Sequence, residues 1–156
     1  MYYAAVAALM LVLPLASIAV ETSLLPQAAH AALAIKWFGF WAVGARLTLA
    51  GLRQVFQPAY TADVILGLGE RGSLVLAREL GFANLALGSV ALTGLLLPAW
   101  RLPAAFAGGL FCLLAGINHV FQRQRNRLQN VAMVSDLFVG AVLNLACLRT
   151  LVLGGL

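Results

Sequence analysis

Seven of the charged, amide or imidazole side chains that lie inside otherwise apolar stretches of the sequence are candidates for a functional site. They are Arg46, Arg53, Glu79, Asn84, Asn118, His119 and Asp136. A charged side chain at the centre of a bilayer costs at least ~2.5–3.5 kcal/mol on insertion scales, so it usually pairs with another group or faces a cavity. The seven residues therefore predict one of two arrangements. They form an ion-pair network that fixes the register of the helices, or a pocket for a headgroup, a proton or a substrate.

The spacing of these residues predicts that they meet at one level of the fold. Arg46 and Arg53 are seven residues apart, so they share one helical face and lie two turns from each other. At ~1.5 Å per residue, Asn84 and Asp136 each lie about 8 Å inside the same end of their segments. We therefore expect a polar patch shared by several helices, in which Arg46 or Arg53 neutralises Asp136.

Helices must position these side chains, because the chain consists mainly of long apolar stretches. Five stretches approach the length of about 20 residues that a helix needs to cross a bilayer. They are residues 2–20, 37–56, 79–97, 103–121 and 131–153. With 63% hydrophobic and only 10% charged residues, the chain has too few polar groups to cover a soluble fold. The sequence predicts an all-α integral membrane bundle in a single domain, 1–156, with a four-helix core (the last four stretches) plus an N-terminal transmembrane helix.

The connections between the stretches predict how the bundle is oriented. The N-terminus and the loops 57–78 and 122–130 fall on one side and carry five arginines, against three basic residues on the other side. Basic loops are typical of the cytoplasmic side, so we expect a cytoplasmic N-terminus. The alanine-rich stretch that ends at Ile35 and residues 61–66 each predict a short helix at the membrane surface.

Small residues four positions apart predict close helix packing. The pairs are Gly44 with Thr48, Ala77 with Gly81, Ala104 with Gly108, and Ala105 with Gly109. Packing within one chain is the favoured explanation, and a homo-oligomer interface is the alternative. The aromatic residues between Trp37 and Trp41 beside Lys36 predict an interfacial belt, with the wall of a ligand groove as the alternative.

Several functional classes are disfavoured by what the sequence contains. A net charge of +5 suggests nucleic acid, but the only dense basic run, residues 123–127, lies between apolar stretches, where basic residues usually signal topology. We expect no metal and no cofactor, because His30 lies in a loop and His119 is the only other histidine. Cys112 and Cys147 are expected to be small buried hydrophobic residues rather than a disulfide.

Four segments carry a resemblance to a known group of proteins. They are FWAVGAR at 40–46, RELGFAN at 78–84, AGINH at 115–119 and NVAMVSD at 130–136. Together they resemble a group of small uncharacterised bacterial membrane proteins, distantly similar to DoxX-like four-helix proteins, over residues 37–150. The resemblance implies a four-helix bundle in a bacterial inner membrane. Some proteins of the broader set are membrane subunits of quinone-linked oxidoreductases.

Three hypotheses about function remain open at this stage. The first is a binding or accessory subunit, self-associating, whose polar cluster holds the headgroup of a membrane lipid or a quinone. The second is a small transporter or proton-conducting protein in which Asp136, Glu79 and the two arginines form a relay. The third is a membrane enzyme acting on a lipid-like substrate, with Glu79, Asp136 or His119 as acid or base.

Overall fold

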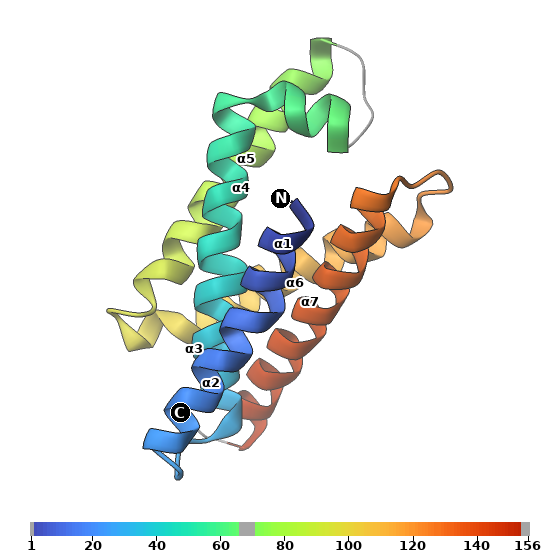
Figure 1. Cartoon of the computed structure of the whole chain (residues 1–156). Coiled ribbons are helices and arrows are strands. Elements are labelled where there is room, and N and C mark those ends of the chain that lie inside the picture. The colour runs from blue at the N-terminus through green and yellow to red at the C-terminus, as the bar shows by residue number, and fades with distance from the viewer. Residues whose placement is uncertain (1, 66–70, 154–156) are drawn as a thin grey trace.

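The computed structural model describes residues 2–65 and 71–153, and these two ranges form a helical bundle without strands (Figure 1). The N-terminal helix consists of α1 (Tyr2–Ala7), the π-helical segment η1 (Ala8–Val12) and α2 (Leu13–Leu24). The second long helix consists of α3 (His30–Phe38), the π-helical η2 (Gly39–Ala45) and α4 (Arg46–Phe56). They are followed by η3 (Tyr60–Ile65), α5 (Arg71–Thr93), the 3-10 turn η4 (Pro98–Trp100), α6 (Arg101–Phe121) and α7 (Arg127–Leu153).

Four helical segments of the described chain are long and apolar enough to cross a membrane. They are Tyr2–Leu24, Ser73–Thr93, Pro98–Phe121 and Arg127–Val152. These segments overlap the first, third, fourth and fifth stretches expected from the sequence, although α5 ends at Thr93 and not at the expected residue 97. The remaining stretch, 37–56, lies within the long helix from α3 to α4, which carries one lysine and two arginines. That this helix also crosses a membrane stays a prediction.

The helices extend beyond the stretches that hydropathy alone indicates. The N-terminal helix continues to Leu24, and α5 begins at Arg71 rather than at residue 79. The alanine-rich stretch does not form a separate surface helix, because Leu33 and Ile35 are only 3% and 2% exposed and draw α3 into the bundle. η3 coincides with the short helix expected at 61–66, except that residue 66 lies outside the described ranges.

Two helical hairpins form the body of the molecule (Figure 1). α5 packs along α4 in one hairpin, and α7 packs along α6 in the other. The long second helix joins them, since its first part, α3, contacts α7 and its last part, α4, contacts α5. The N-terminal helix lies across the space between the hairpins, and its Val6 and Met10 belong to the buried core with Val43 and Leu143. The first helix is therefore an integral part of the core, which the sequence assigned to the last four stretches.

Glycines allow the two helices of each hairpin to approach closely. A Cβ atom added at Gly51 of α4 would lie 2.7 Å from the backbone oxygen of Gly81 in α5. In the other hairpin, a Cβ atom added at Gly140 of α7 would lie 2.7 Å from the backbone nitrogen of Leu113 in α6. Of the small residues identified in the sequence, Gly81 packs on α4, Gly108 on Val43 and Gly109 on Leu143, and these contacts lie within the chain. A homo-oligomer interface stays a prediction.

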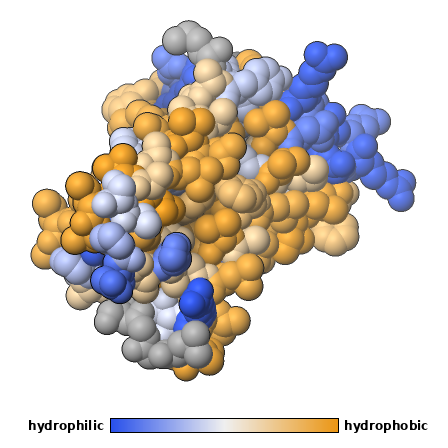
Figure 2. Space-filling model, turned by 60° about the horizontal axis from the view of Figure 1, so that its bottom comes forward, coloured by the Kyte–Doolittle hydropathy of each residue, from blue (hydrophilic) through white to orange (hydrophobic). Residues whose placement is uncertain are grey.

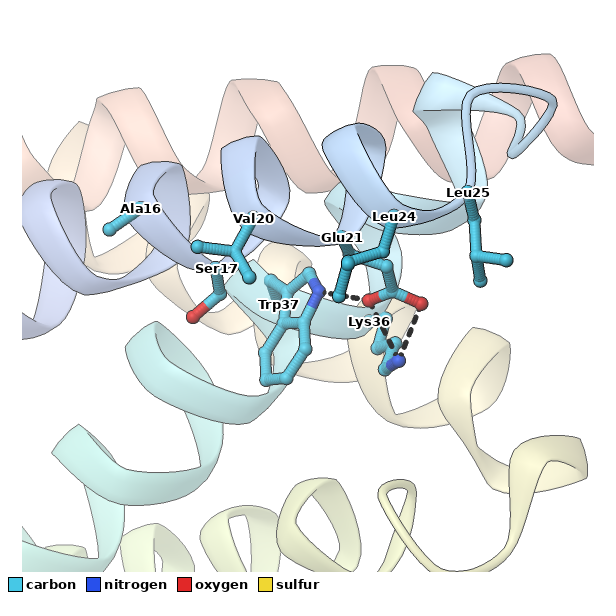
Figure 3. Close-up of a pocket in the computed structure, with 8 residues that line it drawn as sticks. All are labelled: Ala16, Ser17, Val20, Glu21, Leu24, Leu25, Lys36 and Trp37. Carbon is cyan, nitrogen blue, oxygen red and sulfur yellow. Dashed lines mark hydrogen bonds and ion pairs between the residues drawn. The ribbon is translucent and has the colours of Figure 1, made fainter.

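Two tryptophans near Lys36 donate hydrogen bonds from the second long helix to the N-terminal helix. Glu21 of α2 accepts hydrogen bonds from Lys36 Nζ at 2.8 Å and from Trp37 Nε1 at 2.5 Å (Figure 3). One turn further on, Trp41 Nε1 donates to Ser17 Oγ at 3.0 Å. These contacts fasten the N-terminal helix to the second helix at the end of the molecule opposite the N-terminus. The indole groups are part of the interface between helices, which the expectation of an interfacial belt did not include.

Apolar side chains cover a large part of the molecular surface. Figure 2 shows them as a broad continuous area, with hydrophilic residues gathered toward its margins. Many large apolar residues are more than half exposed, among them Val75, Phe82, Leu145 and Val152. The start of α1, η3 and the α6–α7 connection lie toward one end of the bundle (Figure 1), as the hydropathy pattern predicts. This surface is the one that a helical bundle surrounded by lipid requires.

Candidate functional site

A cavity of about 550 Å³ lies between the two hairpins, near the N-terminus of the chain. Its lining comes from α1, η1, α4, η3, α5, α6 and α7. Six of the seven residues singled out in the sequence line it: Arg46, Arg53, Asn84, Asn118, His119 and Asp136. The volume is in the range of sites that hold small molecules and cofactors. The polar residues therefore surround one shared space.

An ion pair joins the two hairpins at this cavity. Arg46, the first residue of α4, places Nη2 2.9 Å from Oδ1 of Asp136 in α7, and the two side chains are 17% and 7% exposed. Arg46 directly follows the π-helical segment η2. Of the two arginines that the sequence offered as partners, Arg46 neutralises Asp136. A buried charge left without its partner is strongly destabilising, so this pair also helps to fix how the hairpins meet.

Arg53 has a different environment. It lies two turns after Arg46 on α4, is exposed, and has no acidic partner among the described residues. Its guanidinium carbon lies 3.5 Å from the centre of the Tyr60 ring in η3. A cation above an aromatic face is attracted by the ring and keeps the N–H groups at its edge available. Arg53 is therefore a positioned cation whose charge is not neutralised by any carboxylate of the described residues.

A pair of buried amides forms the wall between α4 and α5. Asn84 Nδ2 donates to Gln54 Oε1 at 2.7 Å, and the two residues are 4% and 8% exposed. Asn84 Oδ1 has no hydrogen-bond partner within the described part of the chain. A buried acceptor without a partner costs roughly 1–3 kcal/mol. A hydroxyl or amine donor in the cavity would satisfy this oxygen.

The ends of α6 and α7 complete the rim of the cavity. His119 Nδ1 lies 3.1 Å from Gln122 Oε1, and Asn118 is exposed beside it. Arg125 caps α6, because its Nη1 donates to the backbone oxygens of His119, Val120 and Gln122 at 2.7, 2.8 and 2.7 Å. One arginine of the basic loop therefore has a structural task in addition to any effect on topology.

Glu79 does not join the cavity. It is exposed on α5 and is absent from the cavity lining. The reason lies in which face of α5 is buried: Ala77, Gly81 and Asn84 follow a helical spacing and face the bundle, and Gly81 packs directly on α4. Glu79, two residues from Ala77 and from Gly81, points away from that face. The expectation that it belongs to the shared cluster is therefore corrected.

The structure adds polar residues that the sequence did not single out. Tyr2, Gln54, Tyr60, Thr61 and Gln122 also line the cavity. Gln54 had a recognisable signal, since it is a second polar residue next to Arg53 inside an apolar stretch. Tyr2 and Tyr60 had none, because tyrosines at the ends of apolar stretches are also typical of membrane interfaces.

The cavity also has apolar walls that reach the outer surface. Leu9, Leu47, Leu80 and Phe111 contribute to its lining. Leu49 and Leu114 line it as well, yet they are 58% and 57% exposed. The same space is therefore bordered by charged and amide groups and by the apolar outside of the bundle.

Comparison with known proteins gives a family for the chain. The chain matches the model of a family of unknown function, DUF6790, over residues 1–153, and it belongs to this family. The match confirms that the chain belongs to an uncharacterised family, and it includes the N-terminal helix, which the resemblance noted in the sequence left out. No curated protein and no solved structure matches the chain.

Proposed function

We propose that this member of the DUF6790 family is a multi-pass membrane protein that binds the polar headgroup of a lipid-like amphiphile between its two hairpins. One observation carries the proposal. A single cavity is lined by the Arg46–Asp136 pair, Arg53 and Asn84, and also by Leu49 and Leu114, which lie exposed on the apolar surface. A molecule with one polar and one apolar end matches both parts of this lining.

The membrane setting rests on the four apolar helices and on the apolar surface between the polar ends. In this setting the helix from α3 to α4 forms a fifth span. Two of its charged residues, Arg46 and Arg53, face the cavity, and Lys36 pairs with Glu21 of the N-terminal helix. We infer a cytoplasmic N-terminus, because basic connections favour that side, and we propose a bacterial inner membrane as the location. We infer a role as a binding or accessory subunit, alone or as a homo-oligomer, which is the role that the resemblance of the sequence to DoxX-like proteins implies.

The cavity favours binding over acid–base catalysis. Asp136 is the only carboxylate among the described residues that line it, and Arg46 holds this carboxylate in an ion pair. A general acid or base needs a proton that it can exchange with a substrate at hydrogen-bond distance. Among the described lining residues, Arg53 has no carboxylate partner and Asn84 Oδ1 has neither a hydrogen-bond nor an ion-pair partner, and a cation and an amide oxygen are groups that recognise a ligand.

Retention of amphiphiles during purification tests this proposal. The full chain is extracted in a mild detergent, and the lipids and quinones that remain bound are counted by native mass spectrometry. Ala115 lines the cavity, so Ala115→Phe fills part of it, whereas Ala141→Phe adds the same side chain at an exposed position of α7. We expect the bound amphiphile to be lost in Ala115→Phe and kept in Ala141→Phe. Equal retention by both variants would exclude the cavity as the binding place.

Proton conduction is a second candidate, favoured by one observation. Asp136 and His119, two groups that can carry a proton, line the same cavity near the end of the bundle. Proteoliposomes that hold a pH gradient and a pH-sensitive dye test it. Proton flux that depends on Asp136, measured with a folded Asp136→Asn variant, would favour conduction, and a flux equal to that of empty liposomes would reject it.

A further inference from the structure

The charges around the cavity are unequal. Its lining contains two arginines and one aspartate within the described residues. Arg46 and Asp136 neutralise each other at 2.9 Å. Arg53 remains, and the described part of the chain sets the face of Tyr60 but no carboxylate against it. The cavity therefore presents one uncompensated positive charge, held at a defined position.

We propose that the headgroup bound here is an anionic phosphate ester and that Arg53 is the residue that binds its phosphate. This inference rests on the proposed function and specifies its ligand class. The planar guanidinium group offers paired N–H donors that match the oxygens of a phosphate, and such charge-assisted bonds are about twice as strong as neutral ones. Stacking on Tyr60 holds one face of the group and leaves these donors at its edge.

The position of Arg53 along the helix suits a lipid phosphate. Arg53 lies seven residues beyond Arg46, which is about 10 Å at the rise of an α-helix. α4 ends at Phe56, less than one turn later. Arg53 is therefore at the end of the bundle, where headgroups lie, while the Arg46–Asp136 pair is deeper. Leu49, on the same helix and 58% exposed, offers an apolar surface for an acyl chain next to the cavity.

Other headgroups fit this arrangement less well. A zwitterionic phosphatidylcholine brings a cation, and the only carboxylate of the described lining is already paired with Arg46. A quinone ring accepts hydrogen bonds but carries no charge to balance Arg53. An anionic lipid whose headgroup also has hydroxyl groups, such as phosphatidylglycerol, matches the cation and supplies a donor for Asn84 Oδ1.

Binding measurements on the detergent-solubilised full chain test the inference. Short-chain phosphatidylglycerol, short-chain phosphatidylcholine, a short-chain ubiquinone and inorganic phosphate are titrated separately. The variants are Arg53→Gln, Arg53→Lys and, as a matched control, Arg123→Gln, which removes an exposed arginine outside the cavity lining. Circular dichroism confirms that each variant is folded.

We expect phosphatidylglycerol to bind best and Arg53→Gln to weaken its binding by about tenfold to a hundredfold, the loss of one charge-assisted contact. Arg53→Lys should lose less, and Arg123→Gln should stay within about twofold of the original chain, as expected for an exposed charge that makes no contact with the ligand.

Four results would overturn the inference, each in a different way. If Arg53→Gln and Arg123→Gln weaken binding equally, the attraction is a general effect of basic charge. If phosphatidylcholine or the ubiquinone binds as well as phosphatidylglycerol, with no dependence on Arg53, the proposed function stands and the phosphate assignment fails. If inorganic phosphate binds as tightly as phosphatidylglycerol, the ligand is a free anion rather than a lipid. If none of the amphiphiles binds, the proposed function itself is wrong.

Discussion

Replacing Asp136 with asparagine should destabilise the bundle far more than removing an exposed carboxylate. Asp136 is 5% exposed, and the only basic group within ion-pair distance of it among the described residues is Arg46, at 2.9 Å. Asp136→Asn leaves the Arg46 guanidinium, with 17% of its side chain exposed, without a counter-charge. Removing one partner of a buried ion pair usually costs about 3–5 kcal/mol. Because the pair borders a cavity, we expect the lower end, about 3 kcal/mol.

The free energy of unfolding is measured in detergent micelles by titration with a denaturing detergent and circular dichroism. Asp63→Asn is the matched control, because Asp63 is exposed in η3, and it should change the stability by less than about 0.5 kcal/mol. The double variant Arg46→Met with Asp136→Leu removes both charges and should lie within about 1 kcal/mol of the original chain, since an apolar pair replaces the ion pair. The reasoning fails if Asp136→Asn behaves like Asp63→Asn, or if the double variant is as unstable as the single one.

Three further perturbations have expected outcomes in the same unfolding assay. Gly51→Ala should be less stable than Gly39→Ala by about 1–2 kcal/mol. The Cβ atom added at Gly51 meets a backbone oxygen at 2.7 Å, whereas the one added at Gly39 meets only a methyl group at 3.9 Å. Equal stabilities of the two variants would refute close packing of α4 on α5. Glu21→Gln should cost about 1 kcal/mol by weakening the contacts with the lysine and the indole in Figure 3, and an unchanged value would mean that they are exposed contacts of no consequence. Arg125→Ala should cost about 1 kcal/mol more than Arg123→Ala, because only the former removes the bonds to three carbonyls at the end of α6.

The polar residues that share a face with buried positions could be predicted from the sequence. Arg46 and Arg53 are seven residues apart, and the structure places both on the cavity. The choice between them as the partner of Asp136 depends on how deep α7 lies against α4, which is set by tertiary packing. Tertiary packing also decides which face of α5 is buried. The face that contains Gly81 packs on α4, so Asn84 is buried and Glu79 is exposed. The sequence does not indicate this face, because the apolar segment has low amphipathicity.

The role of the N-terminal helix could not be predicted from hydropathy. A span of apolar residues looks the same whether it lies beside a bundle or inside it. In the structure Val6 and Met10 are 8% and 1% exposed and belong to the core, and Tyr2 borders the cavity. The indole hydrogen bonds of Trp37 and Trp41 could not be predicted from the sequence either, because tryptophans at the ends of helices also occur where they face only lipid headgroups.

The most decisive experiment uses an anionic phospholipid that carries a photoreactive diazirine in its headgroup. The full chain is reconstituted with this lipid, illuminated and digested, and the labelled residues are identified by mass spectrometry. We expect labels on Tyr60 and Asn118, which border the cavity from η3 and α6. Labels confined to outward-facing residues such as Phe82 and Leu145, 56% and 66% exposed, would show that the headgroup stays outside the bundle and would contradict binding between the hairpins.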